Sequence, residues 1–128
     1  MKVENCDLIK PLGCTEDDTV QHVAQCLRDN KQRRSVIVNA DGAPVGVVST
    51  TDINNKVVAE GKDATQTKAS EIMTSPIHVV CDMGDDVEGI YEQMVEKSSF
   101  FCPVTKEGKL HGVLTYGEIM AKAREHMA

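Results

Sequence analysis

The sequence has no tryptophan and only two phenylalanines and two tyrosines among its 128 residues. A core built from it must therefore be aliphatic, filled by Val, Ile, Leu and Met. No apolar run approaches the roughly 20 residues that span a bilayer, and the opening residues MKVENCDLIK lack the apolar stretch of a signal peptide. We therefore expect a soluble, cytoplasmic protein that does not associate with a membrane.

Positive charge is also scarce, because 14 Lys and Arg residues face 20 Asp and Glu residues, which gives a net charge of −6. Binding to nucleic acid regardless of its sequence depends on a positive protein surface. The sequence has no basic tract with interleaved aromatic residues. We therefore expect neither a nucleic acid nor an anionic membrane surface as a partner.

The sequence lacks the common signatures of metal sites and catalysis. Its five cysteines are odd in number, no pair forms C-x-x-C, and the four histidines are scattered, so we expect reduced thiols and no metal site. For each cysteine we favour a buried thiol over a ligand or a nucleophile. No phosphate-binding glycine loop, Ser/His/Asp order or carboxylate pair with a defined cleft is recognisable. We therefore predict a protein that is not an enzyme and requires no cofactor.

The sequence does contain one short motif twice, and we call each copy a phrase. GVVSTTDI occupies residues 46–53, and GVLTYGEI occupies residues 112–119. Each phrase follows a segment with apolar residues at i, i+3, i+4 and i+7, which indicates an amphipathic helix. These segments are residues 17–30 and 85–97. After each helix we expect a strand, a turn and a second strand. The second strand contains the first four residues of the phrase.

Both halves therefore follow the order strand, helix, strand, strand, helix, within a mixed α/β (α+β) class. The predicted strands are 35–39, 44–49, 100–104 and 109–115, and the closing helices are 50–61 and 116–127. Each half opens with an apolar lead-in, 8–14 and 72–81, of which the first is the shorter. One such half is too small to cover its sheet, so we expect two halves related by a pseudo-twofold axis to form one module. The predicted boundaries are repeat 1 at 1–61, a polar linker at 62–70 and repeat 2 at 71–128.

The paired helices, the DG and EG turns, the lead-in EIMTSPIHVV and above all the two phrases resemble a pair of cystathionine-β-synthase-type (CBS) repeats. Such a pair is called a Bateman module, here as a small stand-alone protein. The resemblance covers almost the whole chain. It implies a regulatory module that binds an adenosine-containing ligand, such as AMP, ADP, ATP or S-adenosylmethionine, in the cleft between the repeats. It also implies a homodimer that regulates an enzyme or a transporter.

The resemblance assigns roles to the first phrase. Asp52 would hydrogen-bond the ribose hydroxyls, Ser49 and Thr51 would approach a phosphate, and Arg33 or Arg34 would reach that phosphate. Adenine would lie against apolar residues of the lead-in and of the phrase, here Ile77, Val47 and Val48. The chemistry is plausible, because a carboxylate at a helix start can accept from a diol and free N–H groups there suit an anion.

A simpler interpretation remains open for each of these residues. Ser/Thr followed by an acid before a helix is also an ordinary N-terminal cap, and arginines after a helix also suit its C-terminal dipole. In the second phrase Thr115 is kept, but Gly117 replaces a hydroxyl and Glu118 replaces the Asp. We therefore expect one tight site at Asp52 and a weak or empty one at Glu118. The alternative function is a dimeric protein-interaction scaffold whose ligand sites have decayed.

Overall fold

The computed structural model describes residues 1–127 and, within the last helix, side chains up to residue 125. Ala128, the last residue of the predicted second repeat, lies outside the described residues. The chain divides into two compact units. One is continuous, Leu12–Ile77, and the other combines Met1–Pro11 with the chain from His78 onward. The first eleven residues are therefore built into the same unit as the second repeat.

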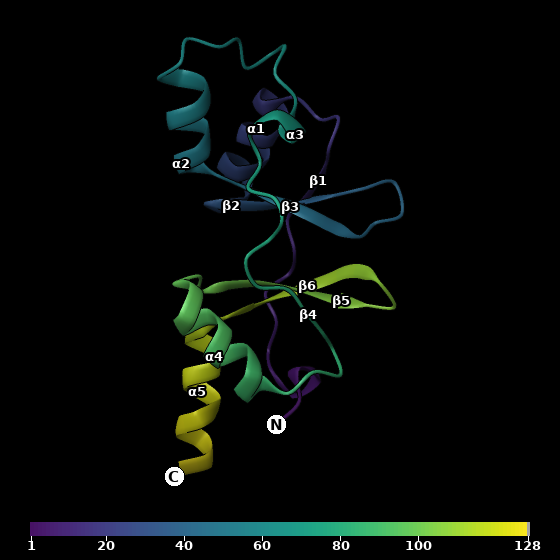
Figure 1. Cartoon of the computed structure of the whole chain (residues 1–128), viewed down its shortest axis with the longest axis vertical. Coiled ribbons are helices and arrows are strands. Elements are labelled where there is room, and N and C mark those ends of the chain that lie inside the picture. Colours follow the sequence, from purple (N-terminus) through teal and green to yellow (C-terminus); the bar gives the residue numbers. More distant parts are fainter. Residues whose placement is uncertain (128) are drawn as a thin grey trace. The chain divides into compact units, whose positions relative to one another are not determined.

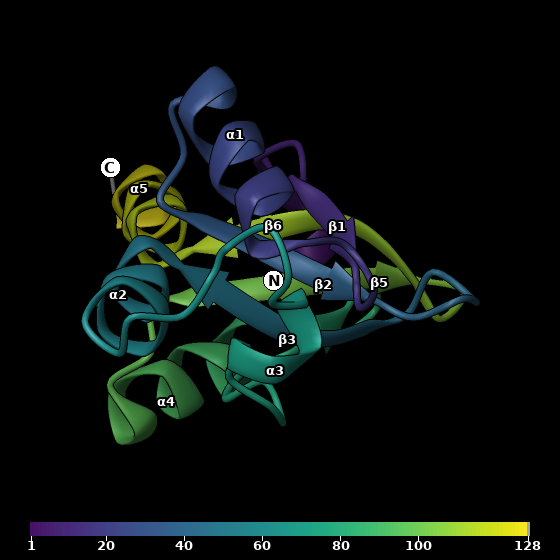
Figure 2. The same ribbon diagram turned by 90° about the horizontal axis from the view of Figure 1, so that it is seen from above.

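The unit Leu12–Ile77 is a three-stranded sheet with its helices on one face (Figures 1 and 2). Strand β2 is central, parallel to β1 and antiparallel to β3. The elements, in chain order, are β1 (Gly13–Thr15), α1 (Val20–Asn30), β2 (Arg34–Val38), β3 (Pro44–Ser49), α2 (Thr50–Ile53), the π-helical turn η2 (Asn54–Val58) and α3 (Ala69–Ile72). The predicted bounds of β3 are confirmed, and the predicted helix 50–61 is divided into α2 and η2.

The second unit repeats this plan. Strand β5 is central, parallel to β4 and antiparallel to β6, and α4 and α5 lie on the same face of the sheet (Figure 1). The elements are the 3₁₀ turn η1 (Val3–Asn5), β4 (Cys81–Asp82), α4 (Val87–Lys97), β5 (Phe101–Lys106), β6 (Lys109–Thr115) and α5 (Tyr116–Met127). The predicted fold class and order of elements are confirmed in both halves.

Each unit has its own aliphatic and thiol-containing core between helices and sheet, as the absence of tryptophan predicts. In the first unit the core residues are Cys14, Val20, Val23, Leu27, Ile37, Val48, Val57, Ala69 and Ile72. In the second they are Val3, Cys6, Val79, Cys81, Val87, Ile90, Met94, Cys102, Val104, Leu114 and Ile119. The i, i+3, i+7 positions of α1 and α4 are the buried ones, so the helical periodicity identified both buried faces.

The segment 62–70, predicted as a polar linker, covers the start of α1. The N–H groups of Val20 and Gln21 donate to the carbonyl oxygens of Thr67 and Ala64 at 2.8 and 3.1 Å. The first N–H groups of a helix have no partner within the helix, and this segment supplies them. Thr67 is buried, so the segment is part of the first unit rather than a loose tether.

Each lead-in pairs with the last strand of a sheet beside the glycine of the repeated phrase. Thr74 exchanges two backbone hydrogen bonds with Val47 in β3 at 2.8 and 3.1 Å, and Ile9 does the same with Val113 in β6 at 2.9 and 3.0 Å. A β-carbon on Gly112 would lie 2.9 Å from Cβ of Leu8, closer than real Cβ contacts come. The glycine of each phrase therefore leaves room for a lead-in.

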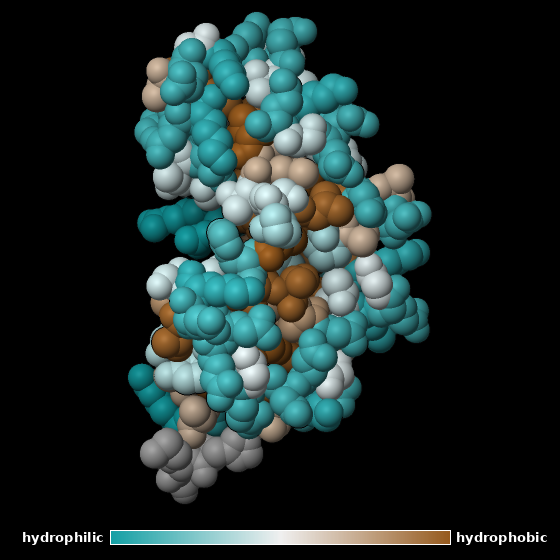
Figure 3. Space-filling model, in the orientation of Figure 1, coloured by the Kyte–Doolittle hydropathy of each residue, from teal (hydrophilic) through white to brown (hydrophobic). Residues whose placement is uncertain are grey.

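The surface is mostly hydrophilic on the face shown in Figure 3, with apolar side chains gathered in patches. The exposed large apolar residues include Ile9, Val58, Val80, Tyr91, Val95 and Phe100. Among the described residues, no helix combines the length and the apolar character needed to cross a membrane.

The close approach at Gly112 gives a testable prediction. We expect Gly112→Ala to lower the free energy of unfolding by about 1–3 kcal/mol, because the new methyl overpacks against Leu8. The matched control is Gly89→Ala in α4, where a new Cβ meets nothing within 4 Å and alanine favours the helix by about 1 kcal/mol. Urea unfolding of both variants tests this. Equal midpoints for Gly112→Ala and the parent protein would contradict the close contact.

Candidate functional site

The first phrase ends in a capping box at the start of α2. The Oγ of Ser49 accepts from the N–H of Asp52 at 3.1 Å, and Oδ2 of Asp52 accepts from the N–H and the hydroxyl of Ser49 at 2.9 and 3.0 Å. The box satisfies free N–H groups at both ends of the turn. Asp52 therefore acts as a helix cap, which is the simpler of the two interpretations of this residue. A ribose-binding role for Asp52 stays a prediction.

The other carboxylate oxygen of Asp52 is held by a lysine. Nζ of Lys56 lies 3.1 Å from Oδ1 of Asp52 and donates to the carbonyl oxygen of Ile72 at 2.9 Å. Lys56 stands in the π-helical turn η2, four residues after the acid, where the two side chains share a helix face. This lysine links the phrase to the second lead-in, and it was missed in the sequence. The signal was present, because both copies continue to a lysine at the same position, Lys56 and Lys122.

The second phrase uses its longer acid differently. Oγ1 of Thr115 accepts from the N–H of Glu118 at 3.2 Å, as Ser49 does in the first phrase. Oε2 of Glu118, however, accepts from the N–H of Asp7 at 2.6 Å, more than a hundred residues away in sequence. The extra methylene lets the carboxylate reach the N-terminal segment. The Asp-to-Glu difference therefore changes a local cap into a long-range contact.

Lys122 completes this contact in the second unit. Its Nζ lies 3.6 Å from Oδ2 of Asp7 and 3.5 Å from Oε2 of Glu125. The carboxylates of Asp7 and Glu125 raise the pKa of the Lys122 ammonium, because they favour its charged form. The lysine at the fourth position after the acid thus contacts a lead-in in the first unit and the residue before a lead-in in the second.

The remaining predicted site residues in and near the first phrase differ in how far their side chains are exposed. The side chain of Val48 is completely buried in the core, because alternation along β3 turns it toward the helices. An adenine contact at Val48, expected through backbone groups and side-chain methyls, stays a prediction. Val47 and Ile77 are half-buried, and Thr51 is exposed. The ligand contacts predicted for Thr51, Val47 and Ile77 stay predictions.

Both predicted arginines are exposed at the start of β2. Arg34 is the register partner of Ser49 across the antiparallel pair. Arg33 lines a cavity of about 440 Å³ together with Lys31 and Thr50, among other residues, and its carbonyl accepts from the N–H of Thr50 at 3.0 Å. The basic residues therefore lie next to the phrase, as the sequence order predicts.

The second phrase has no equivalent cations at these positions. The register pairs Phe101 with Thr115 as it pairs Arg34 with Ser49, and Phe100 precedes it where Arg33 stands in the first repeat. The nearest cation along the sequence, Lys97, donates from Nζ to the carbonyl oxygen of His78 at 2.9 Å. The two phrases thus differ in charge as well as in the length of the acid.

The cysteines are free thiols, four of them buried and Cys26 half-buried. The thiol of Cys102 donates a hydrogen bond to Sγ of Cys81 at 3.1 Å. This hydrogen bond and burial raise the pKa of Cys102. Burial likewise raises the pKa of Cys6. Because the thiolate is the nucleophile, these two thiols are poorly placed for nucleophilic chemistry, in keeping with the buried-thiol interpretation.

The model of the CBS domain matches this sequence twice, over residues 7–59 and 69–125. The chain belongs to the CBS domain family. Each match includes one of the two repeated phrases. The CBS resemblance seen in the sequence is therefore confirmed.

Similar proteins include other CBS-domain chains. A CBS domain protein of Pyrobaculum aerophilum, solved in complex with AMP, is 27% identical, with a TM-score of 0.79 and coverage of 98% of this chain and 99% of that one. Protein MK0525 of Methanopyrus kandleri is 29% identical over 80% of this chain and 53% of its own length. The mitochondrial CBS domain-containing protein CBSX3 of Arabidopsis thaliana is 24% identical over 90% of this chain and 58% of its own length. The chain thus spans little more than half the length of these two curated relatives.

The Glu118 contact is testable by amide hydrogen exchange. We expect Glu118→Ala to speed exchange at the Asp7 amide roughly ten- to hundredfold, because a hydrogen bond to a charged acceptor contributes about 1.5–3 kcal/mol. Asp52→Ala is the control, since its carboxylate bonds within the other unit and should leave Asp7 unchanged. If Asp7 exchanges equally fast in the parent protein and in Glu118→Ala, the carboxylate does not hold the N-terminal segment.

Proposed function

We propose that this CBS chain is a regulatory rather than catalytic module that binds an adenosine-containing ligand, such as AMP, ADP, ATP or S-adenosylmethionine, at the Asp52 phrase. The observation that carries the proposal is its likeness, over nearly the whole of both chains, to a CBS protein solved with AMP. The cytoplasmic location, the absence of nucleic-acid and membrane partners and the regulated enzyme or transporter remain predictions from sequence.

The side chains around Asp52 support a ligand of this class but limit how it is held. A carboxylate offers about four acceptor positions. Three of those of Asp52 are used, by the N–H and hydroxyl of Ser49 and the ammonium of Lys56. The Asp52 side chain keeps 14% of its surface exposed. We therefore propose that a ribose hydroxyl donates to Oδ1 alone, beside Lys56, rather than to both oxygens.

The phosphate end of the ligand would be bound by cations. Arg33 and Arg34 stand at the start of the strand whose register places Arg34 opposite Ser49, and guanidinium groups match phosphate geometry. The hydroxyls of Ser49 and Thr51 follow on the adjoining turn. The corresponding positions before Thr115 carry Phe100 and Phe101, so the proposal gives each chain one strong site at Asp52 and a weak or empty one at Glu118.

The competing function is a scaffold with decayed ligand sites. The contacts of Ser49 with Oδ2 of Asp52 and of Lys56 with Oδ1 are the observation that favours it, because a scaffold needs the cap and not the ligand. Both functions are compatible with a homodimer, and only ligand binding separates them.

A ligand panel tests the proposal. We expect one of AMP, ADP, ATP or S-adenosylmethionine to raise the melting temperature by several degrees at 100 times its Kd, where binding adds about 2.7 kcal/mol. Titration calorimetry should then give one tight site per chain. Asp52→Ala should abolish binding and, because it removes a cap, also cost about 1 kcal/mol of stability.

Glu118→Ala is the matched control for Asp52→Ala. It also removes an acid at the third position of a closing helix, but it should leave the affinity unchanged. Binding that survives in Asp52→Ala would restrict Asp52 to capping. A panel without any shift would favour the scaffold.

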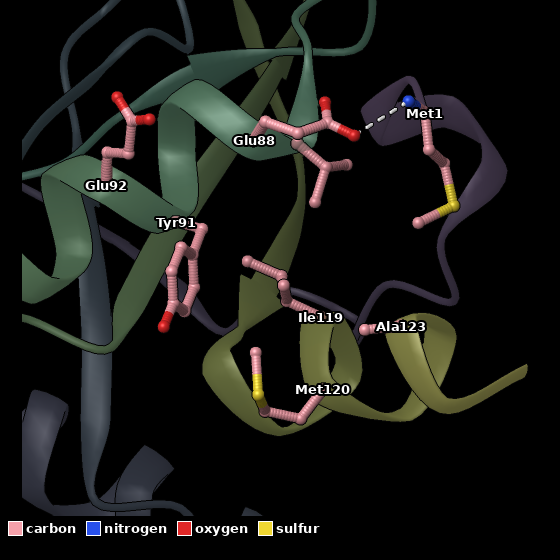
Figure 4. A pocket seen from close by; sticks show the side chains of 8 residues that line it. Met1, Glu88, Tyr91, Glu92, Ile119, Met120 and Ala123 are labelled. Carbon is pink, nitrogen blue, oxygen red and sulfur yellow. Dashed lines mark hydrogen bonds and ion pairs between the residues drawn. The ribbon is translucent and has the colours of Figure 1, made fainter. Parts of the chain in front are cut away.

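We also propose a homodimer that uses the apolar face of α4 and α5. Figure 4 shows Tyr91 of α4 and Ile119 and Met120 of α5 around a cavity of about 710 Å³. Tyr91 and Val95 lie four residues apart on one face of α4 and are 36% and 51% exposed. An exposed apolar face of this kind is typical of association surfaces, and a twofold arrangement is the commonest way to cover it.

Sedimentation tests the dimer. We expect the parent protein at micromolar concentration to sediment with about twice the 14.0 kDa chain mass, and Val95→Glu to sediment as a monomer, since a buried unpaired carboxylate is costly. Val80→Glu is the control, because Val80 is similarly exposed, at 46%, but precedes β4. A monomeric parent protein would exclude the dimer, and a dimeric Val95→Glu variant would exclude this face.

A further inference from the structure

Three side chains with metal-binding atoms converge in the unit Leu12–Ile77. Sγ of Cys14, a ring nitrogen of His22 and Sγ of Cys26 all lie within 4.8 Å of one another. The Nε2 of His22 and Sγ of Cys26 are 3.6 Å apart. Among the described side chains, no other group of three His, Cys, Asp or Glu residues converges in this way. The expectation of no metal site arose because these residues are spread along the sequence.

The local fold brings the three residues together. Cys14 stands in β1, with its side chain in the core. Thr19 then caps α1 by accepting from the N–H of His22, so the helix begins close to the end of the strand. His22 and Cys26 are four residues apart in α1 and share one face. The spacing C-x₇-H-x₃-C is therefore the sequence signal for this cluster.

The distances suit a tetrahedral thiophilic ion. With zinc bonds of about 2.3 Å to sulfur and 2.0–2.1 Å to nitrogen, tetrahedral angles place a sulfur and a nitrogen ligand roughly 3.6 Å apart and two sulfurs roughly 3.8 Å apart. The His22–Cys26 separation of 3.6 Å already meets the first value. Closing the widest separation, 4.8 Å or less, needs a shift of about 1 Å. Cys26 is half-buried and His22 exposed, so both side chains have room for it.

The donor set also selects the class of ion. Two sulfurs and an imidazole suit zinc and similar soft or borderline ions, whereas magnesium and calcium take oxygen ligands. The hydroxyl of the buried Ser35 lies 3.5 Å from Sγ of Cys14 and orients that sulfur. Hydrogen-bonding partners of this kind commonly fix the ligands of metal sites.

The second unit shows that the fold does not require these residues. Cys14 pairs with Ile37 as Cys81 pairs with Val104, so the two cysteines are equivalent. Helices α1 and α4 both begin with a buried valine after the cap, which makes His22 and Cys26 equivalent to Gly89 and Gln93. In the second unit Cys81 instead contacts Cys102. The three-residue cluster is thus peculiar to the first unit, on a helix face that tolerates Gly and Gln.

We propose that Cys14, His22 and Cys26 bind one zinc-class ion per chain. Three protein ligands leave a fourth coordination position, which lies on the solvent side because His22 is exposed and Cys14 is buried. Water or an external ligand completes the coordination there. The site is distinct from the Asp52 phrase and does not depend on the proposed nucleotide function.

Metal titration of the reduced chain tests the site. The protein is stripped of metal, kept under a phosphine reductant that does not bind zinc, and titrated with Zn²⁺ against a chromophoric chelator. A parallel titration uses Co²⁺, whose thiolate complexes absorb in the near ultraviolet. We expect one ion per chain and a thiolate–cobalt band. His22→Gln and Cys26→Ser should each weaken binding at least tenfold and reduce that band.

Matched controls separate binding from folding. Cys81→Ser changes the equivalent cysteine of the second unit and should bind zinc as the parent protein does. His22→Gln keeps the backbone N–H that Thr19 caps, so the metal-free variant should melt at the temperature of the metal-free parent protein. This variant therefore remains informative even if Cys26→Ser folds poorly.

Four results would overturn the proposal. They are a parent protein that binds no zinc, unchanged zinc affinity in His22→Gln, loss of binding in Cys81→Ser, and a Cys14–Cys26 disulfide that persists under the reductant. The last of these would identify a redox pair in place of a metal site.

Discussion

The docking of each lead-in against the last strand of a sheet is the contact on which the rest of the structure depends. The lead-in lies beside the glycine of the repeated phrase and pairs with the residue after that glycine. The lysine that follows the acid bonds to Ile72 of one lead-in and lies 3.6 Å from Asp7, the residue before the other. The phrase G-h-h-S/T-x-x-D/E, where h is a hydrophobic residue, therefore contacts a lead-in without any ligand. Its repetition has a structural cause of its own.

This constraint explains why the two acids differ. Asp52 has the reach to return to its own turn, and its capping box is complete without the lead-in. Glu118 is one methylene longer and bonds to the backbone of Asp7 instead. The first acid stabilises a helix start, whereas the second joins two distant segments of one unit. A ligand that used Asp52 would share a carboxylate already bound on both oxygens, so the proposed site needs the arginines and the adenine contacts as well.

Much of the fold was predictable from the sequence. The apolar periodicity located the buried faces of α1 and α4, and the turn signals gave β3, β6 and α5 with the observed bounds. Contacts between distant residues were not predictable. Nothing in DLIKP indicates that Asp7 belongs with Glu118, because pairing of this kind follows from which sheet edge a lead-in meets. The burial of the Val48 side chain was not predictable either, because alternation along a strand distinguishes two faces without saying which face is the core.

The candidate sites show the same limit. The sequence placed Ser49, Asp52 and the arginines near one another, since one short loop and one strand pair connect them. It could not place Cys14 beside His22 and Cys26, because that contact depends on how tightly α1 follows β1. It also could not separate a capping acid from a ligand-binding one, because both functions need a carboxylate at the start of a helix.

The discontinuous second unit has a consequence for folding during synthesis. The stretch Leu12–Ile77 leaves the ribosome as one continuous unit, and its strands and helices find their partners among near neighbours. Residues 1–11 are made before this stretch, but β6, with which Ile9 pairs, is made about a hundred residues after them. Because closing so long a loop costs entropy that only the finished sheet can offset, we expect residues 1–11 to dock after Leu12–Ile77 has folded.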